Sequence, residues 1–434
     1  MKPRVVIVCL LIFATACFAQ NELTLEQSIQ IALEKSPVVL KSKADIAAAE
    51  GEAGQTVATY LPQLSIIGSI GKSYMQPMTV EFNGTTVTYG TNEQAETTSY
   101  GLSARQKLFD GGKMFSTMGM ASKGLAVAKH ELRKIEQNIT FDVVQSYYGV
   151  MKAAKYVELS SESVGMAQNH LDRVNALENA GMATKADILR TEVLLAKAEL
   201  SLTKAKQVYE LSKNSFNNLL GRDFSAEVTL ATTDFKGTDV ITYQYDDLLK
   251  IAYEQRPDWQ QFLLARGVVE DQVSIAYSGL LPSVSLIGNY ERGSTTYPSY
   301  NYDTKNWQAI LSGSWDILDG TGVYNRIKEA GAQLEAQKAS EQSVQRGLAL
   351  EVKEANFMLK SAKENLAGAQ KALELAQENY EIAETRYKSG LGTNLEQIDA
   401  QVALTQARAE ELDAQHELLV AQARINKVVG SKIY

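Results

Sequence analysis

The sequence is almost free of cysteine and histidine. Its only cysteines, Cys9 and Cys17, both lie near the N-terminus, so a chain that begins after them has no disulfide framework and no thiolate ligand for zinc. Three histidines occur, each single on a helical stretch and none in an HExxH arrangement; they are His130, His170 and His416. We expect all three to be solvated, and we expect no metal site.

Motifs of catalysis are also missing. No serine stands between glycines as a nucleophile elbow requires. The segment Gly68–Ser73 is no phosphate loop, because its glycines are too close together and the pattern around it is that of a strand. A net charge of −8 without a Lys/Arg cluster argues against a nucleic-acid partner. The sequence therefore predicts neither an enzyme nor a nucleic-acid-binding protein, and no cofactor.

Long apolar runs are confined to the N-terminus. Lys2 and Arg4 precede an apolar run that ends in small residues at Ala19, which predicts a secretory signal peptide over 1–19. Cys17 leaves lipoprotein processing open as an alternative. No later stretch reaches the ~20 apolar residues of a spanning helix. We therefore expect an exported chain that is either soluble or enters a membrane as strands.

The chain contains one unit twice. Short motifs early in the unit recur 220 positions later, as Pro37 and Pro257 and as Pro62 and Pro282. Motifs later in the unit recur 209 positions later, as Asp110 and Asp319, Gly181 and Gly390, and Gly221 and Gly430. One gap of 11 residues, between Gly68 and Phe109, separates the two registers. This pattern predicts a first structural repeat over 20–221, a linker over 222–247 and a second repeat over 248–434.

Each repeat is predicted to contain a strand hairpin. Apolar and polar residues alternate over about 63–75 and 97–109, and again over about 283–293 and 305–317. Ten-residue strands with one apolar and one polar face fit an outer-membrane barrel. A soluble sheet with one wet face fits the alternation equally well, although Gly, Ser and Arg on the polar face favour a water-filled lumen. The loop from Gln76 to Glu96 fits an extracellular loop.

Proline is absent from Met78 to Arg256 and after Pro298. The composition there turns to Ala, Glu, Gln, Lys and Leu, which predicts long helices over about 112–180, 184–220, 321–389 and 393–429. The longest would extend roughly 100 Å at 1.5 Å per residue. Helices of this length need partners along their whole length.

Two similar turns join these helices. Gly181 and Gly390 suit left-handed C-terminal caps, and Thr184 and Thr393 suit the N-caps that follow. Asp187 and Glu396 stand three residues further on and would close capping boxes. Glu396 and Asp399 lie one helical turn apart, as solvated acids of a helix start commonly do. Around a three-fold axis the same acids would form a ring that attracts cations.

The leader, the duplicated unit and the GxxT turns together resemble the TolC family of outer-membrane efflux proteins over essentially the whole mature chain. The resemblance implies a fold that is mainly α with membrane β: a homotrimer with a twelve-stranded β-barrel, continued by an α-helical periplasmic barrel. It implies a cell outer membrane location and a passive exit duct of a tripartite efflux or type I secretion system. The implied partners are a periplasmic adaptor, an inner-membrane pump of the RND, ABC or MFS type, and outer membrane lipid.

The resemblance also implies roles for residues of the turns. Gly181, Thr184, Gly390 and Thr393 match the positions where an adaptor docks. The positions that close the periplasmic entrance and form its constriction are matched by four further residues, which are Asp187, Tyr387, Glu396 and Asp399. Gly392 stands where the family has a gate arginine, so Arg386 or Lys388 would have to replace that lock, or the gate is looser.

A soluble periplasmic coiled-coil scaffold or adaptor, with the hairpins in a small β domain, remains the alternative. The pattern fits drugs, metals and proteins as cargo equally well.

Overall fold

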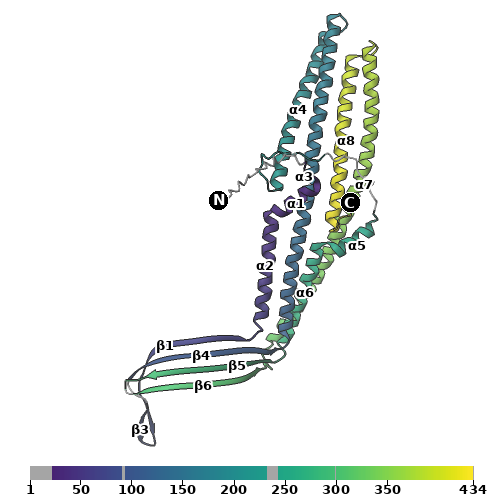
Figure 1. Ribbon diagram of the computed structural model, residues 1–434. Helices are drawn as coiled ribbons and strands as arrows, with labels where there is room; N and C mark the ends of the chain where they lie inside the picture. Colours follow the sequence, from purple (N-terminus) through teal and green to yellow (C-terminus); the bar gives the residue numbers. More distant parts are fainter. Residues whose placement is uncertain (1–21, 90–92, 232–242, 299, 434) are drawn as a thin grey trace, which may run out of the picture. The chain divides into compact units, whose positions relative to one another are not determined.

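The computed structural model describes residues 22–89, 93–231, 243–298 and 300–433 (Figure 1). The predicted signal peptide, with Cys9 and Cys17, lies outside these residues, as does part of the expected linker. The chain forms two compact units. Unit 1 comprises the described residues within 1–39, 135–252 and 351–434, and unit 2 comprises those within 40–134 and 253–350.

The elements follow one another in the same order in both halves of the chain. The first half contains α1 (Leu25–Lys35), α2 (Pro37–Ala58), β1 (Gln63–Met75), β2 (Met78–Phe82), β3 (Thr85–Tyr89), β4 (Glu93–Asp110), α3 (Lys113–Asn179) and α4 (Lys185–Leu219). The second contains α5 (Tyr245–Gln255), α6 (Pro257–Ser278), β5 (Ser283–Thr296), β6 (Asn301–Ser314), α7 (Gly322–Lys388) and α8 (Asn394–Val429). Corresponding helices match in length, since α1 and α5 have 11 residues, α2 and α6 have 22, and α3 and α7 have 67.

The β2–β3 hairpin has no counterpart among the described residues of the second half. It lies within the segment from Gln76 to Glu96, which the sequence suggests is a loop, and within the interval that contains the 11-residue gap. Asn83 and Gly84 form its turn with φ of 47° and 71°, the backbone that an Asn-Gly hairpin turn requires. The extra residues of the first repeat therefore build an additional two-stranded sheet.

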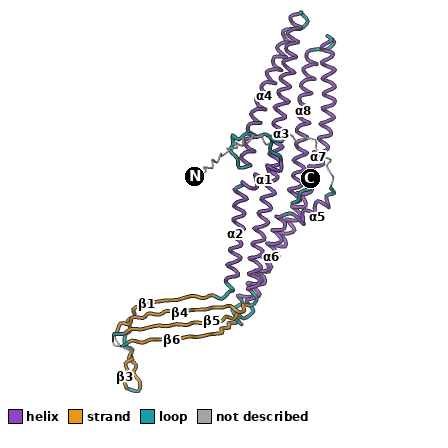
Figure 2. The backbone as a smooth tube through the Cα atoms, viewed as in Figure 1, coloured by secondary structure: helices purple, strands orange, loops and turns teal. Residues whose placement is uncertain are grey.

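A four-stranded antiparallel sheet is the main β structure of unit 2 (Figure 2). Its order is β1-β4-β5-β6, so the central pair joins strands from different repeats. The register aligns Ile66 with Leu102, Leu102 with Tyr290, and Tyr290 with Trp307. Directly opposed residues share a face, so these side chains lie on one apolar face.

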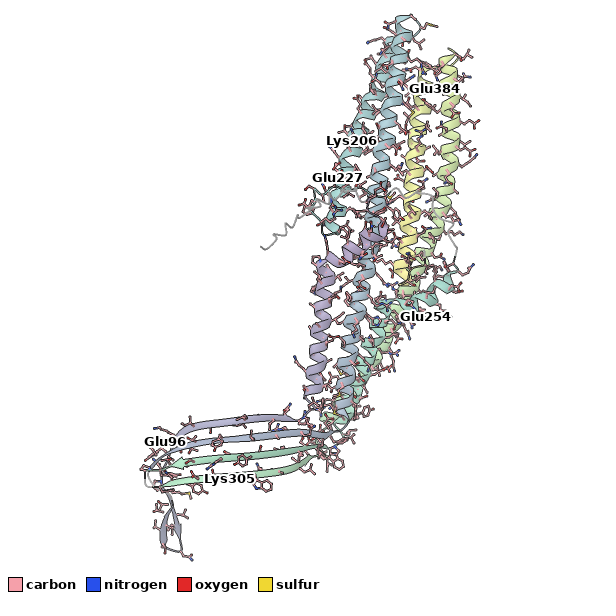
Figure 3. The ribbon with its side chains drawn as sticks, viewed as in Figure 1. Glu96, Lys206, Glu227, Glu254, Lys305 and Glu384 are labelled. Atoms are coloured by element: carbon pink, nitrogen blue, oxygen red, sulfur yellow. The ribbon has the colours of Figure 1, made fainter. Side chains whose placement is uncertain are left out.

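The other face is mainly polar and carries cross-strand hydrogen bonds, although Ile67, Ile287 and Ile310 also lie on it. The Ser69 and Ser99 hydroxyls lie 2.9 Å apart, and the Ser103 hydroxyl donates to the Asn289 side chain at 2.8 Å. The apolar face, in contrast, is open, since Ile66, Ile70 and Trp307 are 82%, 84% and 78% exposed. Figure 3 labels Glu96 and Lys305, which lie on β4 and β6 toward the turn end of this sheet.

The last strand begins and ends earlier in the chain than the sequence indicates. The expected range reaches residue 317, whereas β6 ends at Ser314. The indole Nε1 of Trp315 donates to the carbonyl oxygen of Leu280 at 3.1 Å. This bond takes Trp315 out of the strand alternation and directs the chain toward α7.

Aspartates recur where the sheet meets the long helices. A side-chain oxygen of Asp110 accepts from the backbone N of Met114 at 3.0 Å, and one of Asp319 accepts from Val323 at 2.7 Å. Each carboxylate thus satisfies a donor that the first turn of a helix leaves free. The two Asp-Gly pairs of the duplicated sequence are therefore helix starts.

The core of unit 1 gathers the first helix and the middle of the chain. Its buried members come from α1, α3, α4 and the segment after α4; they are Ala32, Val143, Tyr147, Val150, Phe216, Leu220 and Val228. The Tyr147 hydroxyl donates to the carbonyl oxygens of Leu23 and Ala231, both at 3.3 Å. Leu23 also forms a parallel bridge with Leu230. Across the described residues, we find no helix whose length and hydropathy would let it cross a bilayer.

Candidate functional site at the helical turns

The α3–α4 turn closes with a glycine cap. Gly181 has φ of +76°, and the backbone N of Met182 donates to the Leu177 carbonyl at 2.8 Å. This bond across the helix end is that of a Schellman cap, whose left-handed position favours glycine. Thr184 then caps α4, since its hydroxyl oxygen accepts from the backbone N of Asp187 at 3.2 Å. The predicted left-handed cap and capping box are confirmed here.

The α7–α8 turn repeats this construction. Gly390 has φ of +72°, and Leu391 N donates to the Arg386 carbonyl at 2.9 Å. The Thr393 hydroxyl oxygen accepts from the backbone N of Glu396 at 3.2 Å, and a Glu396 side-chain oxygen accepts from Thr393 N at 3.3 Å. Met182 and Leu391, the residues after the two glycines, are each 75% exposed. Each turn thus presents one large apolar side chain on a rigid backbone.

Gly392 occupies a tight position in the second turn. A Cβ there would lie 3.0 Å from the backbone N of Tyr387 and 3.1 Å from the Cβ of Arg386. The Arg386 guanidinium donates to the Leu391 carbonyl at 3.1 Å, and the Lys388 ammonium pairs with Glu384 at 2.8 Å. Both cations that could replace the missing gate arginine therefore make contacts within their own helix and turn.

Asp187 is the most heavily bonded acid of the turns. One of its carboxylate oxygens accepts from the Thr184 hydroxyl at 2.6 Å and from the Thr184 backbone N at 3.0 Å. These bonds, the hydroxyl first, hold the pKa of Asp187 below its usual value. Asp187 therefore stays ionised at neutral pH at the first turn of α4, where the helix dipole favours a negative charge.

Asn394 links the two turns. Its side-chain Nδ2 donates to the carbonyl oxygen of Asp187 at 3.2 Å, and its side-chain Oδ1 lies 2.8 Å from Nε2 of His170. His170 is only 3% exposed, so the expectation that it is solvated is wrong. It lies where α3 packs against α7 and α8, and burial there lowers its pKa.

Tyr387 packs against this link from α7. Its ring meets the His170 ring edge-on at 5.2 Å, and it forms a small core with Val174 and Ile188. Burial, followed by the nearby charge of Asp187, raises the pKa of Tyr387. The structure thus brings together two of the predicted gate residues, Asp187 and Tyr387, with His170 and Asn394 between α3 and α8.

Glu396 and Asp399 lie apart from this buried cluster. Both are exposed on α8, one turn apart. Among the described residues there is no group of three or more His, Cys, Asp or Glu side chains that could hold a metal ion.

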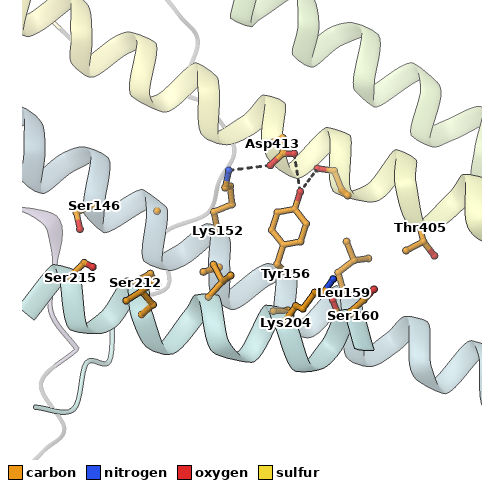
Figure 4. Close-up of a pocket in the computed structure, with 17 residues that line it drawn as sticks. Ser146, Lys152, Tyr156, Leu159, Ser160, Lys204, Ser212, Ser215, Thr405 and Asp413 are labelled. Carbon is orange, nitrogen blue, oxygen red and sulfur yellow. Dashed lines mark hydrogen bonds and ion pairs between the residues drawn. The ribbon is translucent and has the colours of Figure 1, made fainter. Parts of the chain in front are cut away.

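A groove of about 890 Å³ runs between α3, α4 and α8 in unit 1 (Figure 4). On its wall the Tyr156 hydroxyl donates to Asp413 at 2.9 Å, and the Lys152 ammonium pairs with the same carboxylate at 3.2 Å. Burial, with help from Asp413, raises the pKa of Tyr156. Lys204 adds a second positive charge to the lining, and small residues such as Ala153 and Ala205 form much of the rest.

Comparison with known proteins shows to which family the duplicated chain belongs. A family model described as outer membrane efflux protein matches residues 28–222 and again residues 248–431. The chain belongs to the outer membrane efflux protein family. The two matched ranges fall in the two halves of the duplicated sequence. The chain is accordingly an exit duct located in the outer membrane, and the TolC-family resemblance is confirmed.

Individual relatives are distant but match nearly the full length. CyaE of Bordetella pertussis is 23% identical over 406 residues, covering 93% of this chain and 82% of that protein. TolC of Escherichia coli is 23% identical over 437 residues, covering 96% and 84%. Among solved structures, CusC has a TM-score of 0.81 at 17% identity, covering 94% of this chain and 92% of that chain. The outer-membrane channel OprN has a TM-score of 0.76 at 20% identity, covering 94% and 90%. The structural likenesses show the fold.

For this outer membrane efflux protein, sequence reasoning missed His170 and Asn394. A single histidine on a long amphipathic helix has no local signal of burial, and its partner is 224 residues away. The position of Asn394 directly after the cap Thr393 was a usable hint, because an amide at a first helical turn can reach a neighbouring helix.

Proposed function

We propose that three copies of this chain form a closed, twelve-stranded outer-membrane barrel continued by a helical tunnel. The open four-stranded sheet of unit 2 carries this proposal. Within the described residues β1 pairs only with β4, and β6 only with β5. Unpaired strand edges are not tolerated in lipid, so pairing of β1 with β6 of the next copy would satisfy both edges.

The apolar face of this sheet supports contact with lipid. From Leu64 to Ile70 the apolar band of β1 extends about 20 Å along the strand at ~3.4 Å per residue. A strand tilt of about 40° reduces this to about 15 Å across the membrane, within the ~25 Å apolar band of outer-membrane barrels. Toward the turn end of each strand the same face becomes charged. Lys72 is ion-paired to Glu96, while Arg292 and Lys305 oppose each other in the register position of Gly68. A lipid-facing band bounded by a charged rim is what a membrane interface requires.

The exposed turns of unit 1 fit a docking role. A periplasmic adaptor would contact Gly181, Thr184, Gly390 and Thr393, with Met182 and Leu391 as its apolar contacts. The energy for transport would come from an inner-membrane pump of the RND, ABC or MFS type. This chain would act as a passive conduit without catalysis of its own.

The names of relatives indicate a range of cargoes. One is the pyoverdine export outer membrane protein OpmQ of Pseudomonas putida, 21% identical over 425 residues. Another, ArpC of Pseudomonas putida, 22% identical over 337 residues, is named an antibiotic efflux pump outer membrane protein. We propose a secreted or exported small molecule or protein as cargo, chosen by the partner pump.

Membrane fractionation and bilayer recordings test the proposal. We expect the protein to resist carbonate and salt washes, to need detergent for release, and to give single-channel conductance steps as a trimer. A periplasmic scaffold, the alternative class, would wash off and give no steps. Release by carbonate alone would overturn the membrane assignment.

Neutralising Glu396 and Asp399 tests the proposed acidic constriction. With three copies around an axis, Glu396→Gln with Asp399→Asn removes six charges. Two charges 4 Å apart interact by about 1 kcal/mol in water, so we expect the cation-over-anion permeability ratio to fall roughly fivefold. Reversal potentials in a salt gradient measure this ratio.

The matched control removes two exposed acids from α4 instead, with Glu192→Gln and Glu199→Gln. It changes the net charge equally, and we expect the permeability ratio to stay near that of the unmodified protein. Equal ratios in all three proteins would rule out the acidic ring.

A further inference from the structure

A buried hydrogen bond joins the two halves of the duplicated chain close to the helical turns. Nε2 of His170 on α3 lies 2.8 Å from the side-chain Oδ1 of Asn394 on α8. His170 and Asn394 are 3% and 7% exposed. Breaking such a buried pair costs free energy, because each partner left without a hydrogen bond carries the full cost of its desolvation.

The surroundings fix which atom donates. The Asn394 amide nitrogen lies near three oxygen atoms, which are the Asp187 carbonyl at 3.2 Å, the Asp187 carboxylate at 3.4 Å and the Thr191 hydroxyl at 3.5 Å. These acceptors hold the NH₂ group on that side, so Oδ1 turns toward the histidine and accepts. His170 therefore carries its proton on Nε2 and donates it to Asn394.

The same link contacts all four helices of the turn region. His170 belongs to α3, Asp187 and Thr191 to α4, and Asn394 to α8. Tyr387 of α7 packs on the histidine ring at 5.2 Å. The Asn394 amide bonds to Asp187 in the first turn of α4, the capping-box partner of Thr184, so movement of one turn away from the other must break this link.

We propose that His170 and Asn394 are positioning residues for the periplasmic entrance of the duct. Their hydrogen bond holds the α3–α4 turn and the α7–α8 turn together, and protonation of His170 releases the two turns. The inference rests on the proposed duct function and adds to it the control of the periplasmic end. In this proposal the His170–Asn394 pair takes the role that the TolC-family resemblance gives to an arginine at the position of Gly392.

Protonation disfavours the link for a structural reason. Nδ1 of His170 is buried and has no hydrogen-bond partner in the described structure, so a second proton would be a buried donor without an acceptor. Arg173 on α3 and Glu384 on α7 act on the charge of the ring, and Tyr387 on α7 packs against it. Asp187 on α4 lies behind Asn394 and Tyr387. Glu384 favours the cation, but it already pairs with Lys388 at 2.8 Å and Arg173 at 3.6 Å.

The direction of the pH effect follows. Burial, the largest cause, and Arg173 lower the pKa of His170, while the Asn394 bond and Glu384 oppose them. A depressed pKa in the linked state means that the released state binds the proton more strongly. The link is therefore fully present above the ordinary histidine pKa of about 6.5 and is lost as the pH falls below it.

Distances between spin labels on the two turns test the proposal. Met182→Cys and Leu391→Cys place labels on exposed positions of a chain that has no other cysteine after residue 17. Pulsed EPR is recorded on purified detergent-solubilised protein, diluted with unlabelled copies, at pH 7.5 and pH 5. We expect one narrow intrachain distance distribution at pH 7.5 and a broader, shifted one at pH 5.

Three further variants separate the possible outcomes. Glutamine can donate to Asn394 without titrating, so His170→Gln is expected to keep the narrow distribution at both pH values. Asn394→Ala is expected to give the broad distribution at both. His416→Gln is the control: burial lowers the pKa of His416 to about 4, so this change is expected to leave the pH response intact.

Several results would overturn the proposal. They are a distribution in the parent protein that does not respond to pH, a response that survives His170→Gln, or a His170→Gln protein that resembles Asn394→Ala at pH 7.5. Bilayer recordings of the same proteins keep the two proposals apart. Absence of channels would refute the duct while the EPR distances still report on the link.

Discussion

Replacing Ile66 with arginine is expected to prevent stable insertion of the protein in the outer membrane. Ile66 is 82% exposed in the middle of the apolar band of β1. An arginine on the lipid face near the bilayer midplane costs about 2–4 kcal/mol. Three copies would carry this cost together, so we expect the assembled trimer to fall more than tenfold in outer-membrane fractions, measured by immunoblot after native electrophoresis.

The neighbouring residue provides a matched control. Ser65 is also exposed on β1, but it points to the opposite, polar face. Ser65→Arg introduces the same side chain one position away, and we expect trimer levels close to normal with altered conductance. If both variants insert equally well, the apolar face does not meet lipid and the barrel proposal fails.

Replacing both Gly181 and Gly390 with valine is expected to abolish export while trimers persist. Both glycines adopt φ above +70°, where an L-residue costs roughly 1–2 kcal/mol and a β-branched residue more. No atom lies within 4 Å of a Cβ built at either position. The substitution therefore strains and reshapes the turns without a clash in the core, and the proposed adaptor surface is lost.

Export assays combined with crosslinking to the co-expressed adaptor measure this effect. Gly368→Val is the matched control, because Gly368 is an exposed α7 residue that lacks a positive φ and also has free space around its Cβ. We expect this control to export normally. Normal export by the double variant would refute the docking role of the turns.

Local patterns predicted much of the fold. The helical and strand periods, with prolines and glycines at the boundaries, predicted a mainly helical protein with a sheet, and the structure confirms that class. The capping boxes at Thr184 and Thr393 are confirmed for the same reason, since each depends on a few adjacent residues. The docking and gating roles of these turns remain predictions.

What the sequence did not reveal depends on neighbours distant in the chain. Nothing near His170 indicates that Asn394 of α8 contacts it, so the local pattern predicts an exposed histidine. The β2–β3 hairpin is a different case, because Asn83-Gly84 between alternating residues is a strong local turn signal. The surrounding segment, rich in Asn, Thr and Gly, has the composition of a loop, and this composition outweighs the turn signal.

The pairing of β4 with β5 has a consequence for how the protein is made. Thr97 and Thr295, opposed on these strands, are 198 residues apart. At about 5–20 residues per second, synthesis of the intervening chain takes on the order of ten seconds or more. A two-stranded hairpin alone is marginally stable at best, so the β1–β4 pair gains its support only when β5 and β6 have been made. Until then its apolar residues and its strand edge have no partners, the conditions that promote aggregation.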